Sequence, residues 1–193
     1  EARDLDGLSA PARAALDQAV QTYQKLGCTL RRVSLSSIAA ANALATVVIC
    51  VEGAAVHGRT MAERPDDFGP QTLARLRTGL FVPATRYLNA LSLRARMLEG
   101  LLDAGLDEVD ALLVPSLDDP VPTIAASDVA ANPGYAAALT TFARWFRPFN
   151  VLGLPSLAMP TGFDGNGLPL AAPPVGRPFD EPRPFRMAPA LQR

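Results

Sequence analysis

Apolar residues repeat at helical spacing in four stretches of the chain. Residues 9–27 carry them on one face, and Gly27 suits the end of that helix because glycine tolerates a left-handed backbone. Residues 38–56 are apolar at most positions, which predicts a helix buried on all sides. Weaker helical patterns cover residues 71–80 and 83–102, so the chain is predicted to be rich in helices.

Shorter apolar runs predict strands between these helices. Residues 28–35 alternate, except that Arg31 and Arg32 break the pattern, which indicates a bulged or edge strand. Residues 111–114 are all apolar and end at a proline, as in a parallel strand covered on both faces. Two further candidate strands, 156–159 and 168–175, flank a glycine-rich turn. Helices and strands alternate, so we predict an α/β fold with part of a mixed β-sheet flanked by helices.

The remaining segments are predicted to be irregular, apart from a helix over residues 135–146. Loops are expected over 57–70 and 116–133. The tail, residues 177–193, is expected to be irregular, either frayed or misread in the sequence. It contains three prolines where a final helix would lie, and each proline inside a helix costs about 3 kcal/mol; these are Pro182, Pro184 and Pro189.

Composition narrows the classes of partner. The chain has 18 basic and 19 acidic residues and a net charge of −1. It therefore has no excess of positive charge with which to bind nucleic acids or anionic membranes. Glu52 lies within the apolar stretch 38–56, so we interpret that stretch as a helix of a soluble protein and expect Glu52 to be hydrogen-bonded or paired with an arginine.

The cysteines and the N-terminus indicate the compartment. Cys28 and Cys50 are predicted to be buried thiols in a reducing compartment. The N-terminus has no signal-peptide pattern, so a cytoplasmic protein is expected.

No catalytic residue can be assigned from the sequence. The pair Ser36 and Ser37 has no flanking glycine to expose a hydroxyl, so helix capping is favoured. His57, the only histidine, has no serine or acid at a telling distance, and an unrelated hydrolase built on it is a remote alternative. Lys25 is expected to be solvated at a helix end, and Asp118 to form a turn before a proline.

Aromatic residues cluster before a motif-rich segment. Trp145 and Phe146 lie close to Asn150 in the sequence, and core packing is the favoured interpretation of the two rings. The alternative is that Trp145, Phe146 and Asn150 line a substrate pocket. No group of residues has the spacing of a metal site, and no cofactor motif is present, so neither a metal nor a cofactor is predicted.

The segment that follows has the most specific pattern in the chain. Residues 149–156 read FNVLGLPS, residues 159–163 read MPTGF, residues 167–169 read GLP and residues 175–181 read VGRPFDE. In this order they resemble the C-terminal part of the amidase signature family, and the "Asp, aliphatics, Pro" run at 110–115 is similar as well. The resemblance implies that residues 1–193 are the C-terminal portion of a single amidase-like domain.

The resemblance also implies a chemistry. Enzymes of the family cleave carboxamide C–N bonds of small-molecule amides through an acyl-enzyme, using a Ser–cis-Ser–Lys triad in a glycine- and serine-rich segment. That segment has no counterpart here, so the chain is expected to be inactive as it stands. In the tRNA amidotransferase subgroup an acidic residue usually stands seven positions before the motif asparagine, where this chain has Ala143, and this favours a general amidase.

A different class of function remains open. The alternative is a non-catalytic α/β binding or interaction module on the same scaffold. A domain interrupted within its sheet is expected to associate, as a homo-oligomer or through exposed sheet edges, whereas a self-sufficient module should be monodisperse.

Overall fold

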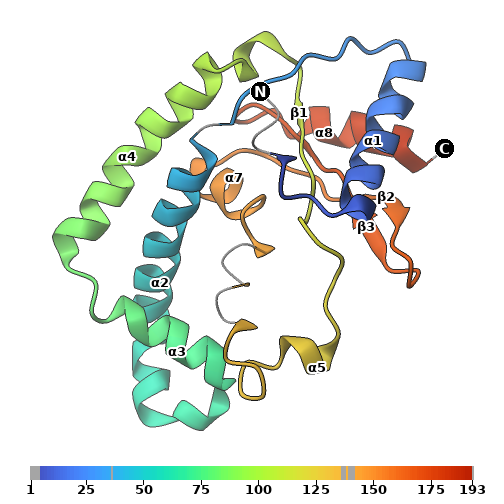
Figure 1. The fold of residues 1–193 in the computed structure, drawn as a ribbon. Coiled ribbons are helices and arrows are strands. Elements are labelled where there is room, and N and C mark those ends of the chain that lie inside the picture. Colours follow the sequence, from blue (N-terminus) through green and yellow to red (C-terminus); the bar gives the residue numbers. More distant parts are fainter. Residues whose placement is uncertain (1–4, 36, 136–137, 139–141, 193) are drawn as a thin grey trace.

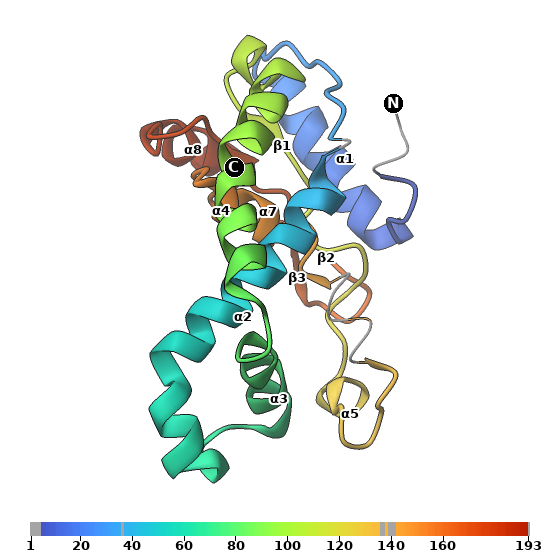
Figure 2. The same ribbon diagram turned by 90° about the vertical axis from the view of Figure 1, so that its left-hand side faces the viewer.

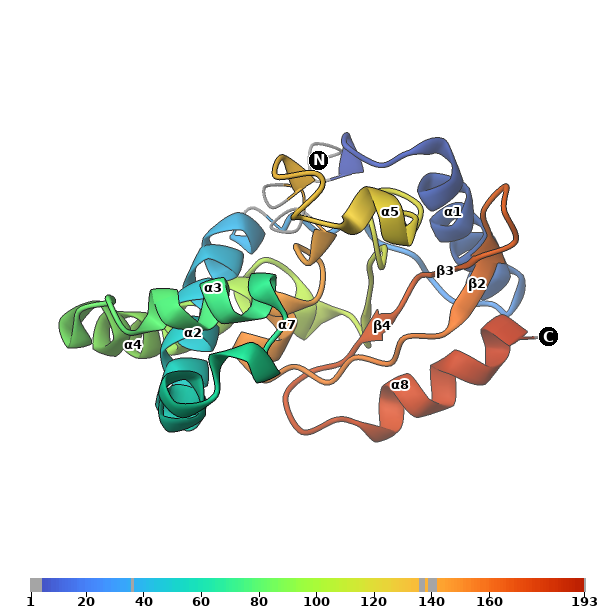
Figure 3. The ribbon, with the colours of Figure 1, turned by 90° about the horizontal axis from the view of Figure 1, so that it is seen from below.

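The computed structural model describes residues 5–35, 37–135, 138 and 142–192. Its elements form two groups that lie on opposite sides of the molecule (Figures 1 and 3). The first group is helical and consists of α2 (Ile38–Glu63), α3 (Pro70–Gly79), α4 (Ala84–Asp103) and α7 (Arg147–Leu152). The second group consists of α1 (Ala10–Lys25), β2 (Pro160–Phe163), β3 (Pro169–Ala171), α8 (Pro182–Met187) and the 3₁₀-helix η4 (Ala188–Gln192).

A short antiparallel ladder lies between the two groups. Strand β1 (Leu112–Leu113) pairs with β4 (Pro174–Val175), with Leu112 opposite Val175. Strands β2 and β3 form a separate antiparallel hairpin. Three short helices complete the described elements: η2 (Pro65–Asp67), η3 (Leu106–Glu108) and α5 (Ile124–Ser127).

The predicted α/β class is confirmed, and most helices lie where the apolar pattern places them. Helices α1, α3 and α4 start and end within two residues of the predicted bounds. The hairpin β2–β3 encloses the predicted turn, but the predicted strand over 156–159 is wrong, because β2 begins only at Pro160. The predicted strand over 168–175 is divided into β3, which pairs with β2, and β4, which pairs with β1. Strand β1 is shorter than predicted and its described partner is antiparallel, so the expectation of parallel pairing for that strand is wrong.

Helix α2 extends seven residues further than predicted, to Glu63, so the predicted loop over 57–70 is wrong. Met61, in the added turns, is buried, so these turns retain a covered apolar position. Figure 2 shows this end of α2, together with α3, projecting away from the rest of the molecule.

The prediction that α2 is buried on all sides is only partly right. In its most apolar window 33% of the helix is buried, and Val56 is 75% exposed. Among the described residues, α2 is the one helix long and apolar enough to cross a membrane by length and composition. It packs on α3, α4 and α7, and its carboxylate Glu52 accepts a hydrogen bond from the Tyr87 hydroxyl of α4 at 2.9 Å, as expected for a polar group in such a helix.

The predicted strand over residues 28–35 does not form. The described part of the chain shows no strand assignment for these residues, which run from α1 to α2. Cys28 lies on this segment and is exposed, so the prediction of a buried thiol holds for Cys50 and is wrong for Cys28. A strand needs a partner for its backbone groups, and the alternating pattern alone does not supply one.

The expectation of an irregular tail is also wrong, because α8 and η4 form there. Pro182 and Pro184 stand in the first turn of α8, where a helix has no intrahelical use for the missing N–H groups. Pro189 lies in the following 3₁₀-helix. The Tyr23 hydroxyl of α1 donates to the Met187 carbonyl at 3.1 Å and ties this tail to the second group of elements.

Five residues of the predicted helix over 135–146 lie outside the described residues: 136, 137, 139, 140 and 141. Residues 143–146 are turns and lead directly into α7.

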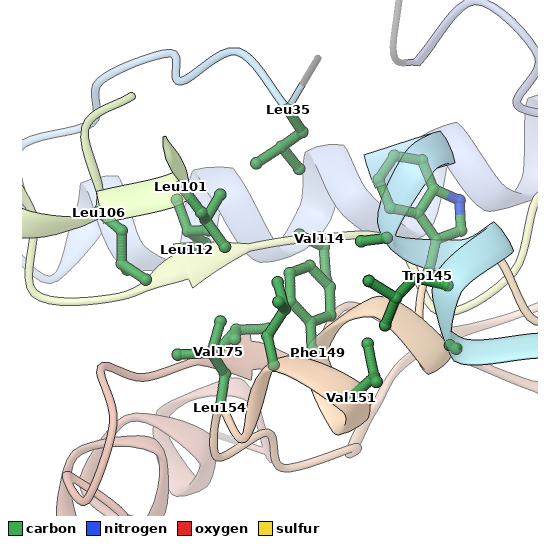
Figure 4. Packing of buried hydrophobic residues seen from close by; sticks show 14 of the residues in the cluster. Leu35, Leu101, Leu106, Leu112, Val114, Trp145, Phe149, Val151, Leu154 and Val175 are labelled. Carbon is green, nitrogen blue, oxygen red and sulfur yellow. The ribbon is translucent and has the colours of Figure 1, made fainter. Parts of the chain in front are cut away.

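The main apolar core joins α2, α4, β1, α7 and β4 (Figure 4). Trp145, Phe149 and Val175 are among its most buried members, each no more than 1% exposed. A smaller cluster lies under α1, where Leu16 and Ala19 contact Ala172. The ladder β1–β4 therefore lies between the two apolar clusters. The residues that follow β1, 114–116, are buried.

Candidate functional site

A buried carboxylate lies just beyond the end of β1. The Asp118 side chain is 7% exposed, and both of its oxygens contact polar groups of the segment before α7. Arg144 Nη2 donates to Asp118 Oδ1 at 2.6 Å, and Trp145 Nε1 donates to the same oxygen at 2.8 Å. Arg144 Nε lies 2.6 Å from Asp118 Oδ2, so the guanidinium faces the carboxylate with two of its nitrogens.

The position of Asp118 follows from the way β1 ends. Strand β1 ends at Leu113, and Pro115 has no amide hydrogen to donate, so backbone bonding continues only through Val114, whose amide donates to the Pro173 carbonyl at 3.3 Å, and through the residues after the proline. Ser116 then holds the chain against β3, since its amide donates to the Ala171 carbonyl at 2.9 Å and its hydroxyl accepts from the Ala171 amide at 3.2 Å. The chain is thereby fixed two residues before Asp118, which can turn its carboxylate inward.

Two further contacts complete this cluster. The Arg144 guanidinium carbon lies 4.7 Å from the centre of the Trp145 ring, which is cation–π geometry. The Ser9 amide at the start of α1 donates to the Asp118 carbonyl at 2.8 Å. Asp118 therefore connects the start of α1, the end of β1 and the segment before α7.

The three residues predicted to line a substrate pocket lie in different environments. Trp145 is 1% exposed and belongs to the main core, where Figure 4 shows it beside Val114, so core packing describes its ring. Phe146 is partly buried, and Asn150 is exposed on α7. Contact of any of the three with a substrate stays a prediction.

The residues considered as nucleophiles or bases do not meet. Ser37 stands at the N-cap of α2 but makes no side-chain cap bond, and Ser36 lies outside the described residues. His57 lies inside α2, and not after a helix as predicted, with its ring edge against Phe68. Lys25 is exposed in the last turn of α1, as predicted.

Among the residues that the structure describes, no hydrogen bond joins a serine hydroxyl to His57 or Lys25. No group of three or more His, Cys, Asp or Glu side chains within the same described ranges could hold a metal ion.

A shallow open hollow of about 280 Å³ lies on another side of β4. It is bordered by the turn after α7 and by the start of α8, and the carboxylate of Glu181 is its charged group. None of the predicted pocket residues lines it.

Two titratable groups are shifted where α2 meets α7. Burial raises the pKa of the Cys50 thiol and lowers the pKa of the Arg147 guanidinium, because burial disfavours the charged form of each group.

Sequence reasoning missed the role of Asp118. The sequence shows a carboxylate after a buried strand, but the turn before Pro120 explains it without any partner. Its partners Arg144 and Trp145 lie 26 and 27 residues further along the chain, so no local pattern reveals them.

Comparison with known proteins identifies the family. The Amidase profile matches residues 2–184. A glutamyl-tRNA(Gln) amidotransferase subunit from Myxococcus xanthus (strain DK1622) is 29% identical over 211 residues, covering 97% of this chain and 42% of that protein. A protein of the same name from Afipia carboxidovorans is 32% identical over 148 residues, covering 73% of this chain and 30% of that protein.

Solved structures show the same fold. The chain superposes on a crystal structure of amidase with a TM-score of 0.80 and 24% identity, covering 96% of this chain and 42% of the amidase. An inhibitor-bound complex described in connection with the origins of an s-triazine catabolic enzyme gives a TM-score of 0.79 and 26% identity, with 97% and 40% covered. The chain thus spans less than half the length of these proteins. With a family match over most of its residues, this chain belongs to the amidase family.

Proposed function

We propose that this chain is the C-terminal portion of an amidase-like hydrolase that cleaves carboxamide C–N bonds of small-molecule amides. The observation that carries the proposal is the match to the Amidase family over residues 2–184, together with a chain that spans 42% of a relative. The nucleophile and its base would be contributed by the remaining part of the fold. This fits the described residues, in which no serine is hydrogen-bonded to a histidine or lysine.

Amide hydrolysis of this kind has two steps. A serine oxygen attacks the amide carbonyl carbon, the C–N bond breaks, and the amine or ammonia leaves with a proton supplied by the base. Water then attacks the acyl-enzyme and releases the acid while the serine recovers its proton. Both steps need a rigid pocket surface that orients the amide, because correct positioning lowers the activation free energy by several kcal/mol.

This chain would contribute one side of that pocket surface. The cluster of Asp118, Arg144 and Trp145 fixes the end of β1 against the segment before α7, and each of its members is held by charge or by burial. Phe146 and Asn150 come directly after this cluster and are less buried, so they are the residues that we propose to face a substrate.

The substrate is proposed to be a general amide and not a tRNA-bound one. The curated relatives described above carry the name of a tRNA amidotransferase component, whereas the solved structures include an amidase. Ala143, seven positions before Asn150, has no carboxylate at the position where that subgroup usually has one. A cytoplasmic location is proposed with this function, in keeping with the thiols and the low net charge.

The direct test measures ammonia release from acetamide, propionamide and benzamide. The purified 193-residue chain is expected to release none above the buffer rate. A chimaera that joins the part of the crystallised amidase not matched by this chain to the complete chain is expected to be active. Release of ammonia by the chain alone would contradict the proposal, and so would a folded chimaera that stays inactive while the parent amidase works.

The second candidate, a non-catalytic interaction module, is favoured by one observation. Large apolar side chains are exposed on α2, with Val56 at 75%, and on the turn between α3 and α4, with Phe81 at 84%, and they offer a surface to a different partner. A folded, active chimaera would exclude this alternative. A chain that is monomeric, unfolds cooperatively and gives no active chimaera would support it.

A further inference from the structure

The turn between β2 and β3 is held by a buried carboxylate. Asp164 is 8% exposed, and its Oδ1 accepts hydrogen bonds from the Asn166 amide at 2.8 Å and the Leu168 amide at 2.9 Å. The Gly167 amide donates to the Asp164 carbonyl at 3.1 Å, and Gly167 has a φ of 79°. A three-residue loop that ends in a left-handed glycine is a common connection between antiparallel strands. The side chain and the backbone of Asp164 therefore both fix the conformation of the loop.

Asn166 and Gly167 form a reactive pair in this turn. Asn166 is exposed, and the turn projects from the second group of elements (Figure 1). A Cβ atom built at Gly165 or Gly167 would meet nothing within 4 Å, so the described residues leave room for a ring to form here. The Asn166 carboxamide thus lies next to the backbone nitrogen of a residue that has no side chain. Attack within one molecule is fast because the two reacting groups are already held together.

We propose that Asn166 is a site of spontaneous deamidation and that the Asp164 carboxylate controls its rate. The Gly167 nitrogen gives up its proton and attacks Cγ of Asn166. A new C–N bond closes a five-membered imide, the bond from Cγ to the side-chain nitrogen breaks, and ammonia leaves with the proton. Water then opens the imide at either carbonyl and leaves an aspartate or an isoaspartate.

The reaction needs only water, so it is independent of the proposed hydrolase function. It releases at most one ammonia from this site in each chain. Continued release that depends on added substrate therefore stays the sign of hydrolase activity.

The folded turn opposes this reaction. The Gly167 amide hydrogen is bonded to the Asp164 carbonyl, and the ring closes only after the peptide unit between Asn166 and Gly167 has rotated. That rotation breaks the bond from Gly167 and disturbs the two bonds that the carboxylate accepts. A reaction that proceeds from an opened state is slowed by the free energy of opening, to which each hydrogen bond contributes.

Deamidation also weakens the turn in which it occurs. It adds a negative charge at residue 166, whose amide is bonded to Asp164 Oδ1, while Asp164 Oδ2 is buried and accepts no hydrogen bond within the described part of the chain. Like charges this close disfavour each other. An isoaspartate also lengthens the backbone by one carbon, which disturbs the pairing of Phe163 with Pro169 at the end of the hairpin. The modified hairpin is therefore expected to open more readily.

Peptide mapping by mass spectrometry measures the reaction on the complete chain in mildly alkaline buffer. The peptide that contains Asn166 should gain one mass unit with time. Two exposed asparagines are internal controls: Asn132 precedes Pro133, whose nitrogen carries no hydrogen, and Asn89 precedes Ala90 inside α4. A gain at either control as fast as the gain at Asn166 would overturn the proposal.

Variants of Asp164 test the control of the rate. Asp164→Ala removes both side-chain hydrogen bonds and should raise the rate at Asn166 about tenfold, toward the rate in a synthetic peptide of residues 161–169. Asp164→Ser, whose hydroxyl can accept one of the two bonds, should give an intermediate rate, and it still reports on the rate if the alanine variant unfolds the hairpin. The control Asp128→Ala removes a carboxylate that accepts from two amides in the turn after α5, and it should leave the rate at Asn166 unchanged.

Two results would contradict these expectations. Equal rates in Asp164→Ala and Asp128→Ala would show that the carboxylate does not control the reaction. An Asp164→Ala chain that keeps Asn166 intact while the synthetic peptide reacts would show that Asn166 is not a deamidation site in this fold.

Discussion

Asp118 is the residue on which the most contacts of the candidate site depend. Replacing it with alanine removes the charge that faces Arg144 and the acceptor of the buried Trp145 Nε1–H. Breaking a buried pair leaves one charge and one donor unsatisfied, so Asp118→Ala should lower the free energy of unfolding by about 3 kcal/mol. Urea unfolding followed by tryptophan fluorescence measures this directly, since Trp145 is the only tryptophan.

The neighbouring Asp119 provides the matched control. It has the same charge but is exposed, and its removal should change stability by less than about 0.5 kcal/mol. Equal effects of the two substitutions would mean that the charge of the loop matters and the buried geometry does not.

Tyr23 makes the stability of the chain depend on alkaline pH. Burial, with a smaller effect of the Cys28 charge, raises the pKa of Tyr23 to about 12 from its ordinary value of 10.0. The folded state therefore favours the neutral phenol, which donates to the Met187 carbonyl. The part of the unfolding free energy that depends on neutral Tyr23 is fully present below pH 10. It is lost as the pH rises from 10 to 12, and it amounts to a free energy on the order of 2 kcal/mol.

The variant Tyr23→Phe isolates that contribution. Its unfolding free energy should be lower than that of the wild type at about pH 8 by about 1 kcal/mol, the value of one hydrogen bond. Between pH 10 and 12 the wild-type curve should fall more steeply than that of the variant. Parallel curves over this range would show that Tyr23 titrates as it does in water.

At the scale of elements, helices were predictable and strand partners were not. Helices α1, α3 and α4 follow from local spacing alone, because each residue's hydrogen-bond partner lies four positions away. Residues 28–35 have the alternation of a strand and still lack a ladder, since pairing depends on a second segment that the pattern does not identify. The prolines of α8 differ from expectation for a similar reason: their cost depends on where the helix starts, and the helix starts later than the pattern indicates.

The same limit applies to the candidate site. Trp145 and Phe146 could be recognised as an aromatic pair from the sequence, with core packing as the favoured role, and Trp145 is indeed buried. Asp118 could be placed after a buried strand, but its contacts with Arg144 and Trp145 depend on tertiary structure that no local pattern encodes.

The contact between α2 and α3 depends on the absence of a side chain at Gly79. A Cβ atom there would lie 1.9 Å from the Cys50 carbonyl oxygen, which belongs to the backbone of α2 and cannot turn away. Gly79→Ala should therefore separate the two helices and lower the free energy of unfolding by about 3 kcal/mol. Gly100→Ala on α4 is the control: it meets nothing within 4 Å and should stabilise the helix by about 0.5 to 1 kcal/mol. Thermal unfolding of the two variants should shift in opposite directions, and a shift of both to higher temperature would show that α3 can move freely on α2.

At the scale of the whole molecule, buried and exposed apolar residues lie in different places. Phe149 is 1% exposed and lies in the core that joins the helical group to β1 and β4. Phe81 is 84% exposed at the turn between α3 and α4, where it contributes little to folding but offers a large apolar surface to other molecules. Other large apolar side chains on α2–α4 and the turns between them are exposed as well: Ile49, Val56, Leu80, Leu88 and Leu93.

Substituting the two phenylalanines separates these roles. Phe149→Ala should lower the free energy of unfolding by about 3 to 5 kcal/mol, through lost burial and the cavity that it leaves. Phe81→Ser should leave that free energy within about 0.5 kcal/mol and reduce concentration-dependent association in sedimentation velocity. If the wild type sediments as a monomer at every concentration, the exposed apolar surface does not drive self-association, which is the behaviour expected of a self-sufficient module that binds a different partner. If Phe81→Ser unfolds as readily as Phe149→Ala, then the α3–α4 turn is covered in solution and α2–α4 must pack more closely than the arrangement described here.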